Sequence, residues 1–277
     1  PECAHSTYTG AYISMKTGFG LGVRRLSLLL VLTLFIAGCT SPDLPDSEPA
    51  ASDTEVVPAV PEVAVLPSAA ELTEGLPRLD GKATVEITVG SEVITVELDG
   101  DKAPYTSGNF VDLAQKGVYD GTTFHRVVKS PEPFVAQGGD PQSKDPQFPV
   151  NRLGTGGYID EATGTERQIP LEILPAGADE PVYGITFPEA RIAELPELDH
   201  KRGAIAMARS GPNTASSQFY IALADLPALD GSYAVFGYVT DGMDIVEDIQ
   251  LNDVISSVKV TAGAENLVSS AADEAVE

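Results

Sequence analysis

The stretch YDGTTFHRV, residues 119–127, shows most directly what kind of fold to expect from this chain. Its Asp-Gly pair is a turn signal, and residues 124–128 form a short apolar run typical of a strand. Arg126 stands in the middle of that run. Because an unpaired charge is costly to bury, an arginine at this position indicates a function for its guanidinium. His125 should face the opposite side of the strand, so we interpret it as structural.

Strand-like segments continue outward from this stretch in both directions. Residues 83–89 and 93–98 alternate apolar and polar side chains, and Gly90-Ser91 between them is a hairpin signal. Further strand-like runs, punctuated by Asp-Gly pairs, lie at residues 123–128, 204–208, 218–223, 233–239 and 255–260. This many short strands predicts a mainly β domain, built as a closed antiparallel barrel.

Two segments have the periodicity of a helix instead. Their apolar faces consist of Phe110, Leu113 and Ala114 in the first segment, and of Ile245, Val246 and Ile249 in the second. Thr106 or Ser107 is expected to cap the first helix and Gly117 to end it. The expected architecture is therefore a barrel with two capping helices.

The composition limits the classes of function. The 277 residues carry 41 acidic and 17 basic side chains, a formal net charge of −24. So acidic a chain is poorly suited to nucleic acid, because phosphate binding requires Lys and Arg to displace counterions. The cysteines, Cys3 and Cys39, lie outside the part with strand patterns, and the three histidines are scattered. We therefore expect no disulfide, no metal site and no cofactor in the domain.

The N-terminal region has the order of a signal peptide. Lys16, Arg24 and Arg25 precede an apolar run at residues 26–36, which is too short to span a bilayer comfortably. The run ends in Ile36-Ala37-Gly38-Cys39, which resembles a bacterial lipobox. This resemblance implies export, lipidation of Cys39 and anchoring to the extracytoplasmic face of the cell envelope. The alternative is an ordinary signal peptide with an incidental cysteine.

The chain is expected to have four parts. Residues 1–38 comprise an upstream stretch and the signal peptide, and residues 39–78 form an acidic, Pro- and Ala-rich linker that cannot bury a core. Residues 79–263 form the folded domain, and residues 264–277 form a disordered acidic tail. Within the domain, residues 159–184 look like an insertion rich in Glu and Pro. The insertion either shapes access to a site or is a solvated decoration.

Five collinear segments of the domain resemble the cyclophilins. They are APYTSGNF at 103–110, YDGTTFHRV at 119–127, FVAQGGDP at 134–141, HKRGAIAMAR at 200–209, and SSQFYI at 216–221 completed by LDG at 229–231 and VFG at 235–237. The resemblance implies a closed eight-stranded antiparallel β-barrel with two capping helices. It also implies peptidyl-prolyl cis–trans isomerase activity on proline-containing polypeptides, without a cofactor, and we expect a monomer.

The chemistry of this reaction needs no nucleophile or metal, because no bond breaks. Amide resonance places a barrier of about 18–20 kcal/mol on rotation of the peptide bond. A donor near the proline nitrogen weakens that resonance, while an apolar pocket holds the ring. By the resemblance, Arg126, Gln137 and Phe134 are the catalytic residues. The substrate-binding residues it implies are Val135, Ala208, Arg209, Gln218, Tyr220, Leu229 and Tyr233.

The chain departs from the family pattern at the rim of the expected pocket. Ala228 stands where many eukaryotic members have Trp, and the other departures are Tyr233 for His, Val135 for Met, Tyr220 for Phe and Arg209 for Asn. Without the Trp, we expect weak binding of cyclosporin.

Other functions stay open at this stage. One alternative is a holdase that binds proline segments with little turnover, and another is a structural lipoprotein of the envelope. A hydrolase triad could be drawn from His200, Asp230 and Ser216 or Ser217, but neither serine lies in a nucleophile elbow.

Overall fold

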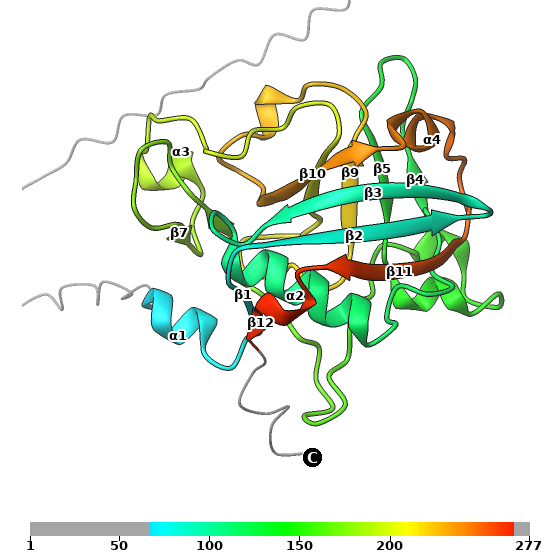
Figure 1. Ribbon diagram of the computed structural model, residues 1–277, viewed down its shortest axis with the longest axis horizontal. Helices are drawn as coiled ribbons and strands as arrows, with labels where there is room; N and C mark the ends of the chain where they lie inside the picture. Colours follow the sequence, from blue (N-terminus) through cyan, green and yellow to red (C-terminus); the bar gives the residue numbers. More distant parts are fainter. Residues whose placement is uncertain (1–66, 269–277) are drawn as a thin grey trace, which may run out of the picture. The chain divides into compact units, whose positions relative to one another are not determined.

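A computed structural model describes residues 67–268 (Figure 1). The predicted signal peptide, Cys39 and most of the predicted linker lie outside the described residues. Among residues 67–268, no helix combines the length and apolar character needed to cross a membrane.

An eight-stranded antiparallel sheet forms the frame of the domain. The spatial order of its strands is β11-β2-β3-β10-β8-β9-β5-β4. The bounds are β2 Lys82–Val89, β3 Glu92–Asp99, β4 Arg126–Val127, β5 Val135–Gly138, β8 Ala204–Met207, β9 Phe219–Ala222, β10 Val235–Asp241 and β11 Ile255–Ala262. The predicted β2–β3 hairpin is confirmed, with Gly90 in the left-handed conformation (φ +62°). β5 was not predicted as a strand.

The expected closed barrel is wrong, because the sheet is open between β11 and β4. Asn252 has a left-handed backbone (φ +72°) just before β11, and β11 forms its ladder with β2. One isolated bridge, between Thr123 and Val254, and four backbone hydrogen bonds of 2.8–2.9 Å join residues 121–124 to residues 252–255 across this gap. The sheet is therefore a half-barrel whose edges touch without a continuous ladder.

Both predicted helices are present, as α2 (Pro104–Gln115) and α4 (Met243–Asp248). The predicted cap of α2 is wrong: Pro104 occupies the first turn, Ala103 precedes the helix without a side-chain cap, and Thr106 lies inside it. Gly117 ends α2 as expected (φ +66°). In Figure 1, α2 lies below β2 and β11, and it packs against β1, β11 and β12.

The smaller elements extend the domain past its predicted limits. β1 (Arg78–Leu79) pairs with β12 (Leu267–Val268), so residues 264–268 belong to the folded part. A capping box of Ser68 and Glu71 begins α1 (Ala69–Thr73) inside the segment predicted as linker. The remaining elements are β6 Glu172–Ile173, β7 Val182–Tyr183, α3 Phe187–Ala190 and the short 3-10 helices η1 Pro141–Lys144, η2 Val150–Arg152, η3 Pro227–Leu229 and η4 Ala264–Asn266.

The core lies between the sheet and α2. Its centre is aromatic: the Phe110 ring stacks on Tyr119 at 4.7 Å and meets Phe219 edge-on at 5.3 Å, and all three are fully buried. The predicted insertion adds a second, small cluster of Leu171, Ile173, Phe187 and Ala234. Because Ala234 precedes β10, this cluster packs the insertion against the main domain.

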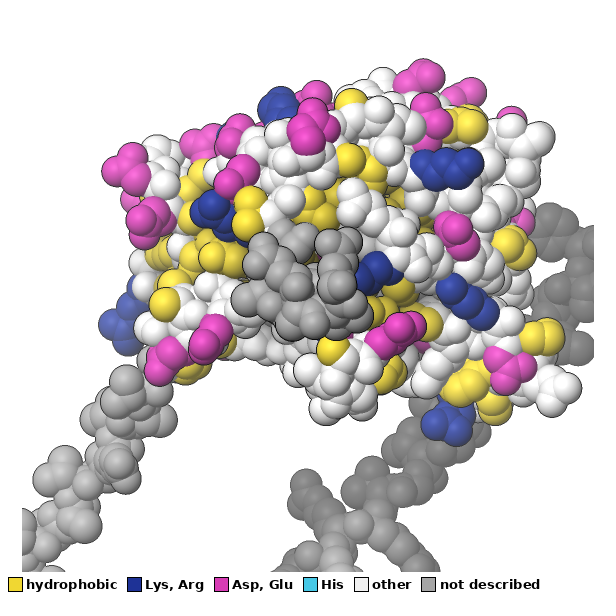
Figure 2. Space-filling view, turned by 60° about the horizontal axis from the view of Figure 1, so that its bottom comes forward, with side chains coloured by type: hydrophobic (Ala, Val, Ile, Leu, Met, Phe, Trp, Pro, Cys, Tyr) yellow, Lys and Arg dark blue, Asp and Glu magenta, His cyan; other side chains and the backbone are white. Residues whose placement is uncertain are grey.

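The surface reflects the acidic composition. Figure 2 shows acidic side chains spread over one face, with single Lys and Arg side chains between them and no basic patch.

Candidate active site

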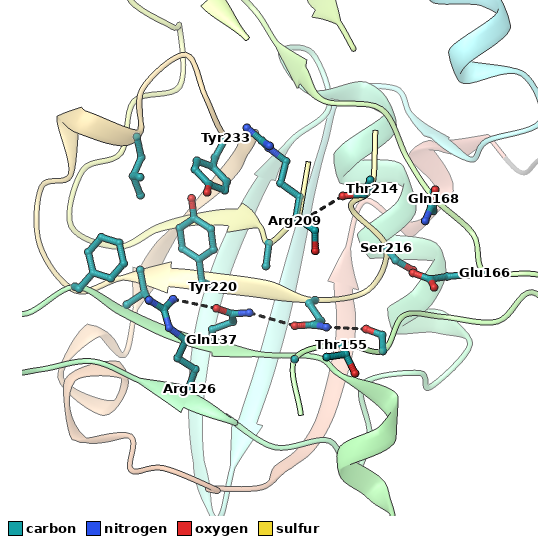
Figure 3. A pocket seen from close by; sticks show the side chains of 18 residues that line it. Arg126, Gln137, Thr155, Glu166, Gln168, Arg209, Thr214, Ser216, Tyr220 and Tyr233 are labelled. Carbon is teal, nitrogen blue, oxygen red and sulfur yellow. Dashed lines mark hydrogen bonds between the residues drawn. The ribbon is translucent and has the colours of Figure 1, made fainter. Parts of the chain in front are cut away.

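One pocket of about 520 Å³ brings together all ten site residues predicted from the sequence (Figure 3). They come from β4, β5, β8, β9 and the segments that follow them. The pairings Arg126–Gln137 and Gln137–Tyr220 place three of these residues in one row across the sheet. Residues nearly a hundred positions apart in the sequence therefore form one surface.

Arg126 is held by a chain of hydrogen bonds that crosses the pocket floor. Its Nη1 donates to Gln137 Oε1 (3.1 Å), and Gln137 Nε2 donates to Gln218 Oε1 (3.1 Å). Gln218 Nε2 in turn donates to the Gly156 carbonyl (2.6 Å). Arg126 is exposed, so its guanidinium can reach a bound ligand without the cost of burying a charge.

Apolar and aromatic side chains form the wall next to Arg126. The Phe134 ring lies 5.5 Å from the Arg126 guanidinium carbon, and Leu229 is half-buried at the same end. Tyr220 and Tyr233 meet edge-on with centroids 6.1 Å apart. A small apolar ring can therefore bind here within reach of a fixed cation. Ala228, which stands where many family members have Trp, is exposed and does not line the pocket. Weak binding of cyclosporin stays a prediction.

Arg209 stabilises the turn that carries Tyr233. Its Nε donates to the Ser232 carbonyl (3.1 Å), Nη2 bonds to the same oxygen, and its guanidinium carbon lies 4.5 Å from the Tyr233 ring centroid. The resemblance implied a substrate-binding role for Arg209. β8 ends at Met207, and the Arg209 side chain supports the pocket wall.

His200 and Asp230 lie behind the aromatic wall, a placement that sequence reasoning missed. His200 Nδ1 is 2.8 Å from Asp230 Oδ1, and Nε2 is 2.9 Å from the Tyr220 hydroxyl. Burial disfavours the charged form of both groups. It therefore lowers the pKa of His200 and raises the pKa of Tyr220. The imidazole is then neutral at pH 7, with Nδ1–H donating to Asp230 and Nε2 accepting from Tyr220. The sequence did contain a sign of this network, because Tyr220 replaces the Phe common in the family and its added hydroxyl needs a hydrogen-bond partner.

This network leaves no serine for a hydrolase triad. Ser216 Oγ accepts from the Tyr158 amide (2.9 Å), and Ser217 Oγ donates to the Gly139 carbonyl (2.8 Å). His125 has neither ring nitrogen in a hydrogen bond of ordinary geometry, and burial lowers its pKa. It packs beside Gly154, which agrees with a structural role. Within residues 67–268, no group of three His, Asp or Glu side chains could hold a metal ion.

The other half of the pocket was not predicted. Besides loop residues 154–156, its walls include Glu166, Gln168, Thr214 and Ser216. Two of these residues, Glu166 and Gln168, come from the predicted insertion. Figure 3 shows them on the far side of Arg209 from Arg126 and Tyr220. The pocket is therefore elongated, with an aromatic end and a polar end.

The comparisons with known proteins identify the family. Residues 84–266 match the family described as cyclophilin type peptidyl-prolyl cis-trans isomerase/CLD. The chain belongs to the cyclophilin-type peptidyl-prolyl cis-trans isomerase family.

Two relatives, from Synechocystis and Arabidopsis thaliana, support this assignment. The chain is 42% identical over 205 residues to a Synechocystis protein named as a thylakoid lumen peptidyl-prolyl cis-trans isomerase, and 37% identical over 211 residues to chloroplastic CYP38 of Arabidopsis thaliana. These matches cover 70% and 69% of this chain but only 50% and 45% of those proteins, so the chain spans about half their length. A Cryptosporidium parvum cyclophilin structure is 26% identical, with a TM-score of 0.48, and the match covers 65% of this chain and 98% of that one.

Proposed function

We propose that the domain is a peptidyl-prolyl cis–trans isomerase that assists the folding of exported proteins. The observation that carries the proposal is the exposed Arg126 guanidinium, oriented by Gln137 (3.1 Å) beside an apolar subsite. The names of the relatives, all peptidyl-prolyl cis-trans isomerases, support the same activity.

A twisted amide is stabilised by a hydrogen-bond donor at its nitrogen and by an apolar surface for the proline ring. With the proline ring against Phe134 and Leu229, Arg126 faces the imide nitrogen. Its guanidinium donates a hydrogen bond to the nitrogen lone pair, which twisting removes from amide resonance. Arginine is always charged, so this donation needs no pKa adjustment. The amide of Gln137 keeps the guanidinium in place. These contacts favour the twisted state over either planar isomer, which is the condition for a faster rate.

The test is a direct measurement of isomerisation by NMR exchange on an Ala-Pro peptide. We expect Arg126→Ala to reduce kcat/KM by about 10²–10³, the usual effect of removing a transition-state donor. Arg202→Ala is the matched control, because Arg202 is exposed and pairs with Glu247, which does not line the pocket. Equal rates for wild type and Arg126→Ala would contradict the isomerase proposal. Tight peptide binding without turnover would favour the holdase.

We further propose export and lipid anchoring through Cys39, with the domain acting as a monomer on a flexible linker. The lipobox-like residues Ile36-Ala37-Gly38-Cys39 support the anchor, and the lumenal and chloroplastic names of two relatives support export. Metabolic labelling with a radioactive fatty acid should mark the wild-type chain and not Cys39→Ser. Equal labelling of both would reject the anchor, and sedimentation tests the monomer.

A further inference from the structure

The polar end of the pocket contains a carboxylate that the proposed isomerisation does not use. Glu166 lines the pocket opposite the aromatic end (Figure 3), and no Lys or Arg among residues 67–268 forms an ion pair with it. A Cβ on Gly157 would come within 2.2 Å of Glu166 Oε1 and 2.6 Å of Ser216 Oγ. The missing side chain at Gly157 therefore leaves room for the carboxylate beside the serine.

A buried arginine fixes the backbone that carries Glu166. The Arg167 side chain is 8% exposed; its Nη2 donates to Asp160 (3.0 Å), its Nη1 bonds to Asp112 of α2, and its guanidinium carbon lies 5.0 Å from the Tyr158 ring centroid. The Arg167 amide also donates to the Tyr158 carbonyl (2.9 Å). Neighbouring side chains of an extended segment alternate in direction. While Arg167 points into the domain, its neighbours Glu166 and Gln168 therefore face the pocket.

The charges in the pocket are separated along its length. Arg126 and Arg209 are engaged at the aromatic end, by Gln137 and by the Ser232 carbonyl respectively. Glu166 is the acidic side chain of the lining, and the polar groups near it are neutral. A polypeptide lying along the pocket, with its proline beside Arg126, would place a nearby side chain against this carboxylate.

We propose that Glu166 forms a second subsite for a cationic side chain, Lys or Arg, close in sequence to the substrate proline. This inference rests on the proposed function for the position of the proline. Glu166 is the specificity residue of this subsite. Solvent screens the attraction between the Glu166 carboxylate and the cationic side chain. The attraction therefore favours some substrates over others and leaves the rate of rotation about the Xaa-Pro bond unchanged.

The test measures binding, so that it does not depend on turnover. The probes are short peptides with one Ala-Pro bond and a single variable residue, Lys or its neutral analogue norleucine, placed in turn at each of about three positions on either side. At one position or more, we expect the Lys peptide to bind wild type about two- to fivefold more tightly at low ionic strength. Glu166→Gln should remove this difference, and high salt should reduce it. Glu161→Gln is the matched control, since Glu161 is exposed in the same segment and does not line the pocket.

The outcomes separate the inference from the proposed function. Equal binding of Lys and norleucine peptides at every position would overturn the subsite, as would a Lys preference that Glu166→Gln retains. Loss of the preference in Glu161→Gln would also overturn it, because the effect would then be one of general charge. Absence of turnover with every peptide contradicts the isomerase proposal but leaves the binding preference as a measure of the subsite.

Discussion

Gln137 shows how a single neutral side chain can control a charged one. Arg126 is exposed and would sample many rotamers, but Gln137 accepts its hydrogen bond and is itself held by Gln218. The family resemblance predicted both residues as catalytic, and the structure shows the hydrogen bond between them. The onward link from Gln218 to Gly156 depends on a loop that only the folded chain brings near.

At this scale we predict that Gln137→Leu lowers kcat by about tenfold or more and changes KM little. The reason is the loss of a hydrogen bond to a charged group, which contributes about 1.5–3 kcal/mol. Steady-state isomerisation rates at several peptide concentrations separate the two constants. Gln147→Leu, at an exposed position outside the pocket, should behave as wild type. A rise in KM with kcat preserved would show that Gln137 binds substrate and does not orient Arg126.

His200 lies behind the pocket wall, where burial favours its neutral form. Burial holds its pKa below the ordinary value of 6.5, although Asp230 and Asp199 act in the opposite direction. The unfolded chain takes up a proton near pH 6.5, whereas the folded chain does so only at lower pH. The free energy of unfolding must therefore fall as the pH drops below about 6.5.

We accordingly predict that wild type loses about 1 kcal/mol more of its unfolding free energy than His200→Asn does between pH 7.5 and 5.5. Urea denaturation at the two pH values measures this. His125, whose pKa burial also lowers, is present in both proteins, so its contribution cancels. Parallel pH dependence in the two proteins would mean that His200 titrates as it does in the unfolded chain.

At the scale of elements, the insertion is part of the domain and not a loose decoration. Helix α2 has no side-chain cap of its own, and Glu172 of β6 supplies one from the insertion. Its carboxylate accepts from the Thr106 amide (2.8 Å), the Thr106 hydroxyl (2.7 Å) and the Tyr105 amide (3.2 Å). The sequence predicted α2 correctly but assigned its cap to a neighbour in the chain, because a cap more than sixty residues away leaves no local pattern.

We predict that Glu172→Ala lowers the free energy of unfolding by about 2–4 kcal/mol, because it leaves buried donors at the start of α2 without an acceptor. Glu172→Gln retains one acceptor oxygen and should lower the free energy of unfolding by less than Glu172→Ala does. Urea or thermal denaturation measures both. Asp179→Ala, at an exposed site in the same insertion, provides the control. If Glu172→Ala were as stable as this control, the insertion would not cap α2.

At the scale of the whole domain, the two ends of the described chain stabilise each other. β1 pairs with β12, the Asp80 amide donates to the Asn266 carbonyl (2.9 Å), and Asn266 Nδ2 donates to the Lys82 carbonyl (2.8 Å). Leu267 also packs on the core. Part of the segment predicted as a disordered acidic tail, residues 264–268, therefore belongs to the fold.

We predict that a chain ending at Gly263 keeps its fold but loses about 1–3 kcal/mol of unfolding free energy, from the lost pairing and the partly buried Leu267. The matched control is a chain ending at Val268, which retains β12. Comparison of the urea midpoints of the two truncated chains tests this. Equal midpoints for both would show that β12 adds nothing to stability.

Features that depend on local periodicity and on ordered motifs could be predicted from the amino-acid sequence. These were the β2–β3 hairpin, helices α2 and α4, the family, and the ten residues that meet in one pocket. Tertiary structure alone decided the open sheet, the cap of α2 by Glu172, the His200 network and the polar end of the pocket at Glu166. The physical reason is the same in each case. These features join groups far apart in the sequence, and their contact follows from packing, which no local pattern encodes.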